Sequence, residues 1–381
     1  VKRMKITAYK LKRVNPKNNS HIFYKVQFRD PRTGKPTTRN GFTGKREAKV
    51  EVMEEISRLM QDDFTDNPNI TFSKVAEKWL NNKRHTVAGA TYCKYKSQYE
   101  NHLKVAFKDK PIINITLDDC QQLVFDYADK YKRWDKLIGT FSSVFRFALK
   151  YGITKNNPFD RVERPKIEHD NEPKSLAVDE YPIFKEAINK HYRENNYKAF
   201  TFLWILALTG LRKGELSGLH WNDVDLTSGF IYVRKAITRD YDGKLVEAEN
   251  PKNKYSIRSI PISDETIEIL KKWRKCQHQQ LEKFNINTYE KPDQLVFTSQ
   301  NGGILSPSKP RKWLNVITKK YGLTKISPHG LRHTFATVLA NKNVSSTVIA
   351  SEMGHKDTTI TNKIYVDLRK VQDHNTSKLL E

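Results

Sequence analysis

Two arginines and a histidine stand in local patterns that suit the binding of a phosphate. His329 and Arg332 are three residues apart, just after Ser327, a good N-cap, and Pro328, which suits a first helical turn. This spacing places the imidazole and the guanidinium on one face near the start of a helix. Arginine binds phosphate through two parallel hydrogen bonds, and Arg212 is the second candidate arginine. Taken alone, the pair also fits a solvated arginine beside a histidine at a helix start.

The order of motifs along the chain carries more information than any one of them. Arg212 follows the apolar run 202–208 and a glycine turn, and Gly354-His355 comes later, with Tyr365 ten residues after the histidine. Together with the His-x-x-Arg motif, this ordered set resembles the signature of the tyrosine recombinases, the phage-lambda-type and conjugative-transposon integrases. The resemblance covers the C-terminal half of the chain by specific motifs and the rest by layout only.

The resemblance implies metal- and ATP-independent DNA strand transfer, with a role for each catalytic residue. Tyr365 would be the nucleophile, and its attack on DNA would leave a 3′-phosphotyrosine and a free 5′-hydroxyl. Arg212 and Arg332 would hold the two non-bridging oxygens of the phosphate. His329 is the candidate general base, because an imidazole titrates near neutral pH. His355 would donate a hydrogen bond to a phosphate oxygen.

The remaining candidates are a supporting carboxylate and a general acid. Glu215 lies one turn beyond Arg212 and is expected to orient that arginine or a neighbouring histidine. In the family a lysine on a β-hairpin protonates the leaving 5′ oxygen. The run 251–258 resembles that hairpin motif and places the acid at Lys252, with Lys254 as the alternative.

Composition indicates the class of partner. The net charge of +25 predicts a polyanion, and nucleic acid is favoured over a membrane surface. Three scattered cysteines make neither a disulfide framework nor a zinc site and fit a reducing compartment. No apolar run is long enough to span a bilayer, and the first residues lack a signal-peptide pattern. We therefore expect a protein of the bacterial cytoplasm or nucleoid, with no cofactor and no metal.

Periodicity predicts a mainly α chain with small antiparallel sheets, an α+β multidomain fold. We expect a three-stranded sheet backed by one helix in residues 1–65, a helical bundle in 70–160, a linker in 161–174, and a mixed α+β domain with a C-terminal tail in 175–381. This layout resembles an arm-type DNA-binding domain, a SAM-like core-binding domain and a tyrosine-recombinase catalytic domain.

Within these domains the pattern predicts individual elements. Strands are expected at 230–237 and 256–262, with a turn at 240–243. Predicted helices are 90–105, 116–131, 134–151, 264–284, 306–321, 327–340 and 346–353, with a further one near Tyr365.

The basic residues of the first two domains are the candidate DNA contacts, although most such side chains in proteins are merely solvated. They are Lys10, Lys12, Arg13, Lys25, Arg39, Lys94 and Lys96. The resemblance implies core-type and arm-type attachment sites on double-stranded DNA, a homo-tetramer on that DNA, a directionality factor, a host DNA-bending protein, and no membrane.

Two alternative functions and the role of the C-terminal tail remain open at this stage. The scaffold could serve a catalytically silent DNA-binding regulator, or an enzyme that relaxes supercoils as a type IB topoisomerase does. The tail at 371–381 either docks on a neighbouring subunit or is a frayed end.

Overall fold

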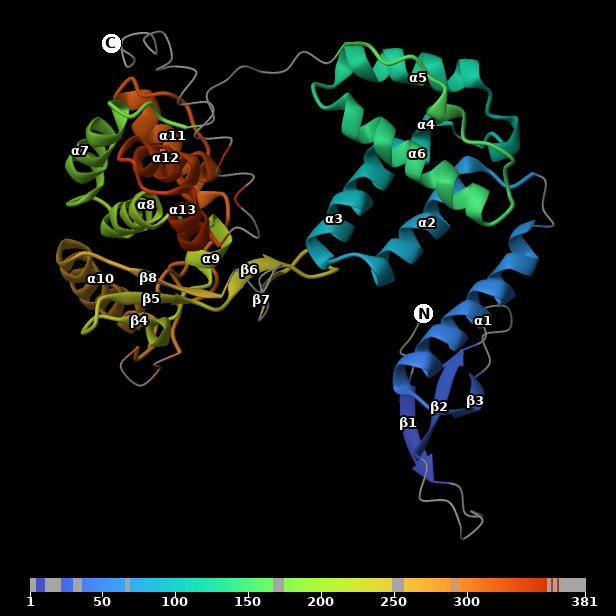
Figure 1. Ribbon diagram of the computed structural model, residues 1–381, viewed down its shortest axis with the longest axis horizontal. Coiled ribbons are helices and arrows are strands. Elements are labelled where there is room, and N and C mark those ends of the chain that lie inside the picture. The colour runs from blue at the N-terminus through green and yellow to red at the C-terminus, as the bar shows by residue number, and fades with distance from the viewer. Residues whose placement is uncertain are drawn as a thin grey trace, which may run out of the picture. The chain divides into compact units, whose positions relative to one another are not determined.

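The computed structural model divides the chain into two compact units, Val1–Glu168 and His169–Glu381, and each is described by itself (Figure 1). Helices predominate and the sheets are small and antiparallel, which confirms the predicted fold class. None of the helices in the described part of the chain is long and apolar enough to cross a membrane. The described residues are 5–10, 22–29, 36–65, 69–107, 109–166, 175–248, 257–288, 291, 293–354, 358 and 362.

The first unit begins with the predicted sheet-and-helix module. Val26 and Phe28 alternate with exposed residues on the central strand, and both are buried against Ala48 and Val52 of the following helix. One sheet face is therefore covered by the helix, as the period-two pattern requires. The elements are β1 (Lys5–Lys10), β2 (Ile22–Arg29), β3 (Pro36–Phe42) and α1 (Lys45–Thr65), with sheet order β1-β2-β3.

A helical bundle makes up the rest of the first unit. Phe72, Phe141 and Phe145 stack at its centre, and Thr71 caps the first helix by accepting a hydrogen bond from the Lys74 amide. The helices are α2 (Phe72–Thr86), α3 (Gly89–Gln98), α4 (Lys104–Ala106), α5 (Leu117–Lys130) and α6 (Trp134–Lys150), with 3-10 turns at Ile112–Asn114 and Pro158–Asp160.

The helix expected at 90–105 is not continuous. A π-helical turn, Tyr99–Leu103, separates α3 from α4. Such a turn absorbs one extra residue, and Tyr92, Tyr99 and Leu103 all reach the core around it.

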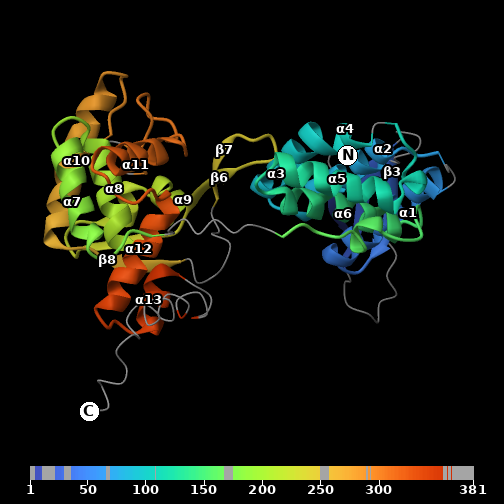
Figure 2. The same ribbon diagram turned by 90° about the horizontal axis from the view of Figure 1, so that it is seen from above.

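In the second unit α8 is the central helix. Nearly every residue from Ala199 to Thr209 is buried, because α7, α10, α11 and α12 all pack on it, as Figure 1 and Figure 2 show. The helices of this unit are α7 (Glu180–Tyr192), α8 (Tyr197–Thr209), α9 (Lys213–Ser217), α10 (Asp264–Glu282), α11 (Lys309–Lys320), α12 (Pro328–Asn341) and α13 (Ser346–Met353), with a 3-10 turn at Trp221–Asp223.

The strands of the second unit form two sheets, where one long strand was expected at 230–237. That prediction is wrong, because β5 pairs with β8 and β6 pairs with β7, and residues 234 and 235 between them belong to neither strand. The first sheet has the order β4-β5-β8, and a turn at 240–243 joins β6 to β7 in the second. The strands are β4 (Val224–Asp225), β5 (Phe230–Val233), β6 (Ala236–Arg239), β7 (Leu245–Ala248) and β8 (Arg258–Pro261).

Candidate active site

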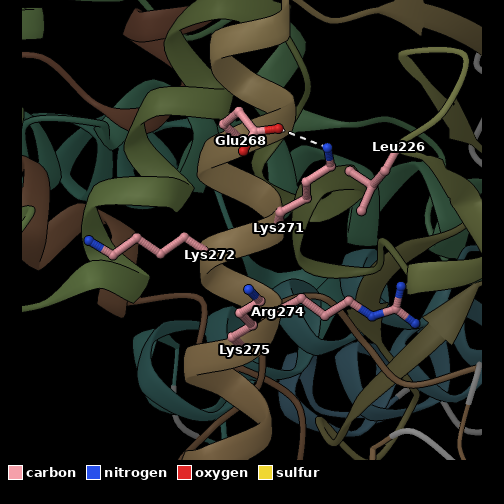
Figure 3. A pocket seen from close by; sticks show the side chains of 6 residues that line it. All are labelled: Leu226, Glu268, Lys271, Lys272, Arg274 and Lys275. Carbon is pink, nitrogen blue, oxygen red and sulfur yellow. Dashed lines mark hydrogen bonds and ion pairs between the residues drawn. The ribbon is translucent and has the colours of Figure 1, made fainter.

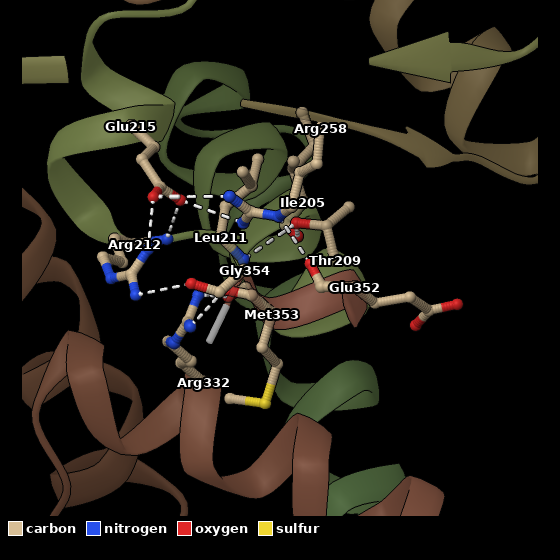
Figure 4. A network of polar contacts seen from close by, with 11 residues as sticks. Ile205, Thr209, Leu211, Arg212, Glu215, Arg258, Arg332, Glu352, Met353 and Gly354 are labelled. Atoms are coloured by element: carbon tan, nitrogen blue, oxygen red, sulfur yellow. Dashed lines mark hydrogen bonds and ion pairs between the residues drawn. The ribbon is translucent and has the colours of Figure 1, made fainter. Parts of the chain in front are cut away.

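Three arginines from separate segments converge on the C-terminal end of α13 (Figure 4). Arg212 immediately precedes α9, Arg258 opens β8, and Arg332 lies near the start of α12. Each guanidinium donates to a different backbone carbonyl of three consecutive residues. The last carbonyls of a helix lack intrahelical partners and form the negative end of its dipole, so they attract cations. The pairs are Arg258 with Glu352, Arg332 with Met353, and Arg212 with Gly354.

Arg332 is the most deeply placed of the three. It is 1% exposed, and it also donates to the Gly210 carbonyl over 2.6 Å. Burial, followed by the charge of Arg212, lowers the pKa of Arg332 to about 9. The guanidinium therefore keeps its positive charge at neutral pH, in a setting where charged side chains are rarely found.

Gly210 explains how α8 and α12 come close enough to bring Arg212 and Arg332 together. It ends α8 with φ at +59°, a left-handed conformation that favours glycine. A Cβ at this position would stand 2.6 Å from the Phe335 ring of α12. Glycine is therefore required at position 210 by the backbone angle and by the closeness of the Phe335 ring.

Arg212 is fixed by Glu215, which is buried at 3% exposure. Its Nη1 donates to Oε1 over 2.7 Å, and its backbone N–H donates to Oε2 over 2.9 Å. The Arg212 side chain remains 37% exposed, so part of the guanidinium is open to a ligand. The predicted supporting contact between Glu215 and Arg212 is present.

Arg258 is the residue of this network that the sequence reasoning did not single out as a site residue. Its side chain is 7% exposed, and it donates to both oxygens of Glu215. A signal existed, because side chains alternate along a strand and Arg258 shares a face with Ile260, which is 2% exposed. That reading requires the strand register, which the sequence alone left open.

His329 lies one turn before Arg332, at the edge of the network. Part of the ring is exposed, and its centroid lies 4.7 Å from that of His333 in an edge-to-face arrangement. Burial of the remainder, followed by the charges of Arg332 and Arg212, lowers the pKa of His329 below its ordinary value. The imidazole is therefore neutral at neutral pH, which is the form that accepts a proton.

The electrostatics of the cluster favour an anion. Arg212 and Arg258 donate to the Glu215 carboxylate, and Arg332 lies near enough to feel its charge, while the Glu352 carboxylate points away from the three guanidiniums in Figure 4. The carbonyls of α13 offset the remaining positive charge only in part, since they contribute a partial negative charge. A phosphate held by two guanidinium forks suits this arrangement.

Comparison with known proteins places this site in a family. Residues 174–372 match the model of the phage integrase family, and residues 71–126 match the phage integrase N-terminal SAM-like domain. The chain belongs to the phage integrase family. It is a tyrosine recombinase, as the motifs predicted, and tyrosine recombinases are enzymes that catalyse DNA strand exchange.

Curated relatives of the family match over most of the chain. A XerC-like tyrosine recombinase of Caldanaerobacter subterraneus subsp. tengcongensis is 28% identical, over 97% of this chain and 98% of its own length. The ICEBs1 integrase of Bacillus subtilis is 24% identical, over 88% of this chain and 90% of its own length.

Solved structures of integrases share the fold. The Tn1549 transposon integrase with circular intermediate DNA covers 78% of this chain and 95% of its own, with a TM-score of 0.64 and 24% identity. A lambda integrase dimer on a core site has a TM-score of 0.56 and 18% identity, and it covers 90% of this chain and 92% of its own.

Four of the predicted catalytic candidates lie outside the described residues: Lys252, its alternative Lys254, His355 and Tyr365. Their neighbours in sequence are described. β7 ends at Ala248 and β8 begins at Arg258, so the lysines fall between these two strands. His355 directly follows Gly354, whose carbonyl accepts from Arg212.

Two of the predicted DNA contacts of the first module lie on opposite faces of its sheet. Lys25 is exposed on β2. Arg39 lies opposite Val26, on the face covered by α1, and its Nε donates to Glu55 of that helix over 2.9 Å. Arg39 therefore supports the packing of α1, whereas Lys25 lies on the other face of the sheet. Lys12 and Arg13, and the side chain of Lys10, lie outside the described residues.

Lys94 and Lys96 of the helical bundle are both exposed on α3. They stay predictions as DNA contacts, and their exposure leaves them open to a phosphate backbone.

A second basic cluster, on α10, has a different character from the arginine network (Figure 3). Lys271 pairs with Glu268 over 2.8 Å, Lys272 lies over the Tyr197 ring, and Arg274 lies over Trp221. These side chains line a pocket of about 520 Å³. Each of these three cations has its own acid or aromatic partner, and they do not share a carboxylate as Arg212 and Arg258 do.

Proposed function

We propose that the chain is a site-specific DNA recombinase, an integrase, that cuts and rejoins DNA to integrate and excise a mobile element or prophage. The observation that carries the proposal is the convergence of Arg212 and Arg332 on the adjacent carbonyls of Met353 and Gly354. Two guanidiniums so close together are spaced for a single phosphate.

The proposed reaction is attack of the Tyr365 hydroxyl on the scissile phosphorus. His329 takes the tyrosine proton, which its lowered pKa permits at neutral pH. Arg212 and Arg332 stabilise the extra negative charge on the non-bridging oxygens, and His355 donates a hydrogen bond to one of them. The products are a 3′-phosphotyrosine and a 5′-hydroxyl, and a 5′-hydroxyl of a second strand reverses the step.

The leaving 5′ oxygen needs a proton, and we assign it to Lys252, with Lys254 as the alternative. Both follow the β6–β7 hairpin in sequence and precede β8, which carries Arg258. Since the phosphotyrosine ester retains the energy of the broken bond, rejoining requires neither ATP nor a metal.

We further propose a division of labour along the chain. Residues 1–65 bind arm-type sites, residues 70–160 bind core-type sites, 161–174 link the halves, and residues 175–381 carry the chemistry. A lambda integrase tetramer has been solved on a Holliday junction, with a TM-score of 0.55 to this chain, and supports a homo-tetramer on DNA. A directionality factor and a host DNA-bending protein complete the proposed complex, which would work in the bacterial cytoplasm, at the nucleoid.

The test uses nicked suicide duplexes that span the ends of the element encoding the chain. The wild-type protein should form a covalent complex that survives denaturation, and Tyr365→Phe should form none. Adding a partner duplex should then give exchanged strands. A wild-type protein that binds the duplex but never becomes attached would identify a DNA-binding regulator. Relaxed supercoils without exchange would identify a topoisomerase.

A further inference from the structure

Arg258 differs from Arg212 in its exposure and from Arg332 in its partners. Its side chain is 7% exposed, against 37% for Arg212, and it lies on the strand side of the network. It donates to the Glu215 carboxylate and to the Glu352 carbonyl, whereas Arg332, which is 1% exposed, donates to the backbone carbonyls of Gly210 and Met353. A guanidinium whose charge is offset by a buried carboxylate acts on that carboxylate rather than on a ligand.

The carboxylate of Glu215 is shared evenly between two arginines. Its Oε1 accepts from Nη1 of Arg212 over 2.7 Å and from Nη1 of Arg258 over 3.4 Å. Its Oε2 accepts from the Arg212 backbone over 2.9 Å and from Nη2 of Arg258 over 3.0 Å. With two donors on each oxygen the carboxylate is held against rotation, and the Arg212 fork is held with it.

Arg258 also keeps this carboxylate charged. Burial alone would raise the pKa of Glu215, but the charge of Arg258, then hydrogen bonds from Arg258 and Arg212, lower it overall. The charged groups facing Glu215 are Arg212 at the start of α9, Arg258 on β8 and Arg332 on α12. From α13 the network receives backbone carbonyls, while the Glu352 carboxylate points away in Figure 4.

The same guanidinium joins β8 to the end of α13. Arg258 donates to the first of three consecutive carbonyls, that of Glu352. The next two carbonyls, of Met353 and Gly354, accept from Arg332 and Arg212. α13 then ends at Gly354 with φ at +63°, directly before His355 in sequence. The position of this turn thus depends on a contact made from β8.

We infer that Arg258 is a positioning residue for DNA strand cleavage. It holds Arg212 through Glu215 and fixes the α13 terminus on which Arg212 and Arg332 meet. The inference rests on the proposed function, since it is cleavage that the positioning serves. Loss of the positioning should slow cleavage at saturating DNA and leave DNA affinity unchanged, because Arg258 itself does not reach the phosphate.

The experiment measures single-turnover formation of the covalent complex on a nicked suicide duplex, from pH 5 to pH 9, with DNA affinity and thermal melting measured alongside. The variants are Arg258→Gln, Arg258→Lys, Glu215→Gln and the double variant Arg258→Gln/Glu215→Gln. Arg274→Gln is the matched control, because it removes an arginine that lies over Trp221, outside the network.

Arg258→Gln should lower the rate about 100-fold, the scale of a misplaced catalytic group. Its rate should also rise with pH, because Glu215 has lost its main source of stabilising charge and ionises only at higher pH. That pH dependence should disappear in the double variant. Arg258→Lys keeps the charge but not the fork, so it should lose about 10-fold in rate without the new pH dependence.

Two results would overturn the inference while the wild-type protein cleaves. One is wild-type rates in both Arg258 variants. The other is a lower rate in folded Arg258→Gln whose pH profile has the same shape as that of the wild-type protein. In that case Arg258 would only stabilise the fold. If Arg258→Gln does not fold, Arg258→Lys is the deciding variant. A reduced cleavage rate in that variant supports the inference, and a wild-type rate contradicts it. A wild-type protein that forms no covalent complex would instead remove the proposed function, and the inference with it.

Discussion

The arginine network of the second unit and the exposed lysines of the helical bundle carry the same sign of charge in opposite settings. Arg332 and Arg258 are almost fully buried, and each is hydrogen-bonded to two or more groups. In the bundle, Lys94 and Lys96 are exposed, and Lys83 lies over the rings of Trp79 and Tyr95.

This difference separates two uses of positive charge. An exposed lysine contributes to affinity for a polyanion through counterion release and needs no fixed geometry. A buried arginine costs desolvation, which only a fixed and fully bonded geometry offsets. We therefore expect substitutions in the network to affect the rate of cleavage, and substitutions in the bundle to affect binding.

The largest effect is expected for Arg332→Lys. A lysine keeps the charge, but its single nitrogen cannot replace the planar fork whose two terminal nitrogens donate to Gly210 and to Met353. The cleavage rate at saturating DNA should fall by about 10²–10³-fold, as for loss of a transition-state donor. Quenched-flow or gel assays of the covalent complex measure this, with a filter-binding assay as control. A fall in affinity with an unchanged rate would reverse the distinction between the two regions.

His329→Gln should lower the cleavage rate by about 10²-fold, the lower end for loss of a general base. The pH profile gives a sharper test. Because the pKa of His329 lies below its ordinary value of 6.5, the neutral form persists to lower pH. The wild-type rate should therefore hold its plateau below pH 6.5 and fall only in more acidic buffer. A profile that falls already above pH 6.5 would count against His329 as the base.

Gly210→Ala should destabilise the protein through both backbone and space. The left-handed conformation costs about 1–2 kcal/mol for a residue with a Cβ. Overpacking against Phe335, 2.6 Å away, costs about 1–3 kcal/mol more. Gly322→Ala is the matched control in the same unit, with φ at +65° and no described atom within 4 Å. Thermal unfolding should show a larger loss at Gly210, and equal losses would contradict the close approach of α8 and α12.

The smallest effects are expected for Lys94→Gln and Lys96→Gln. If each lysine neutralises one phosphate, log affinity plotted against log salt should lose about 0.9 of slope per substitution. The cleavage rate at saturating DNA should not change. A variant with wild-type affinity at every salt concentration would show that its lysine is only solvated.

Local signals in the sequence were sufficient for much of the fold. Ser327 caps α12 and Pro328 stands in its first turn, as predicted, since capping depends on near neighbours. The division of residues 230–237 into β5 and β6 could not be predicted, because it depends on which strands each half pairs with, β8 for β5 and β7 for β6.

The candidate site shows the same limit. The motifs led to Arg212, Glu215, His329 and Arg332, and the structure brings Arg212, Glu215 and Arg332 into one network with His329 at its edge. Arg258 was missed because its partners come from α9 and α13, far away in sequence. Long-range pairings of this kind leave no periodic trace in one sequence.

The most direct test is a structure of the Tyr365→Phe protein bound to a duplex with its recombination site. We expect the guanidiniums of Arg212 and Arg332 to donate hydrogen bonds to non-bridging oxygens of the same phosphate, with Arg258 still on Glu215. If Arg212 and Arg332 are found on different phosphates, or on no phosphate at all, these two arginines do not form a clamp for the scissile phosphate.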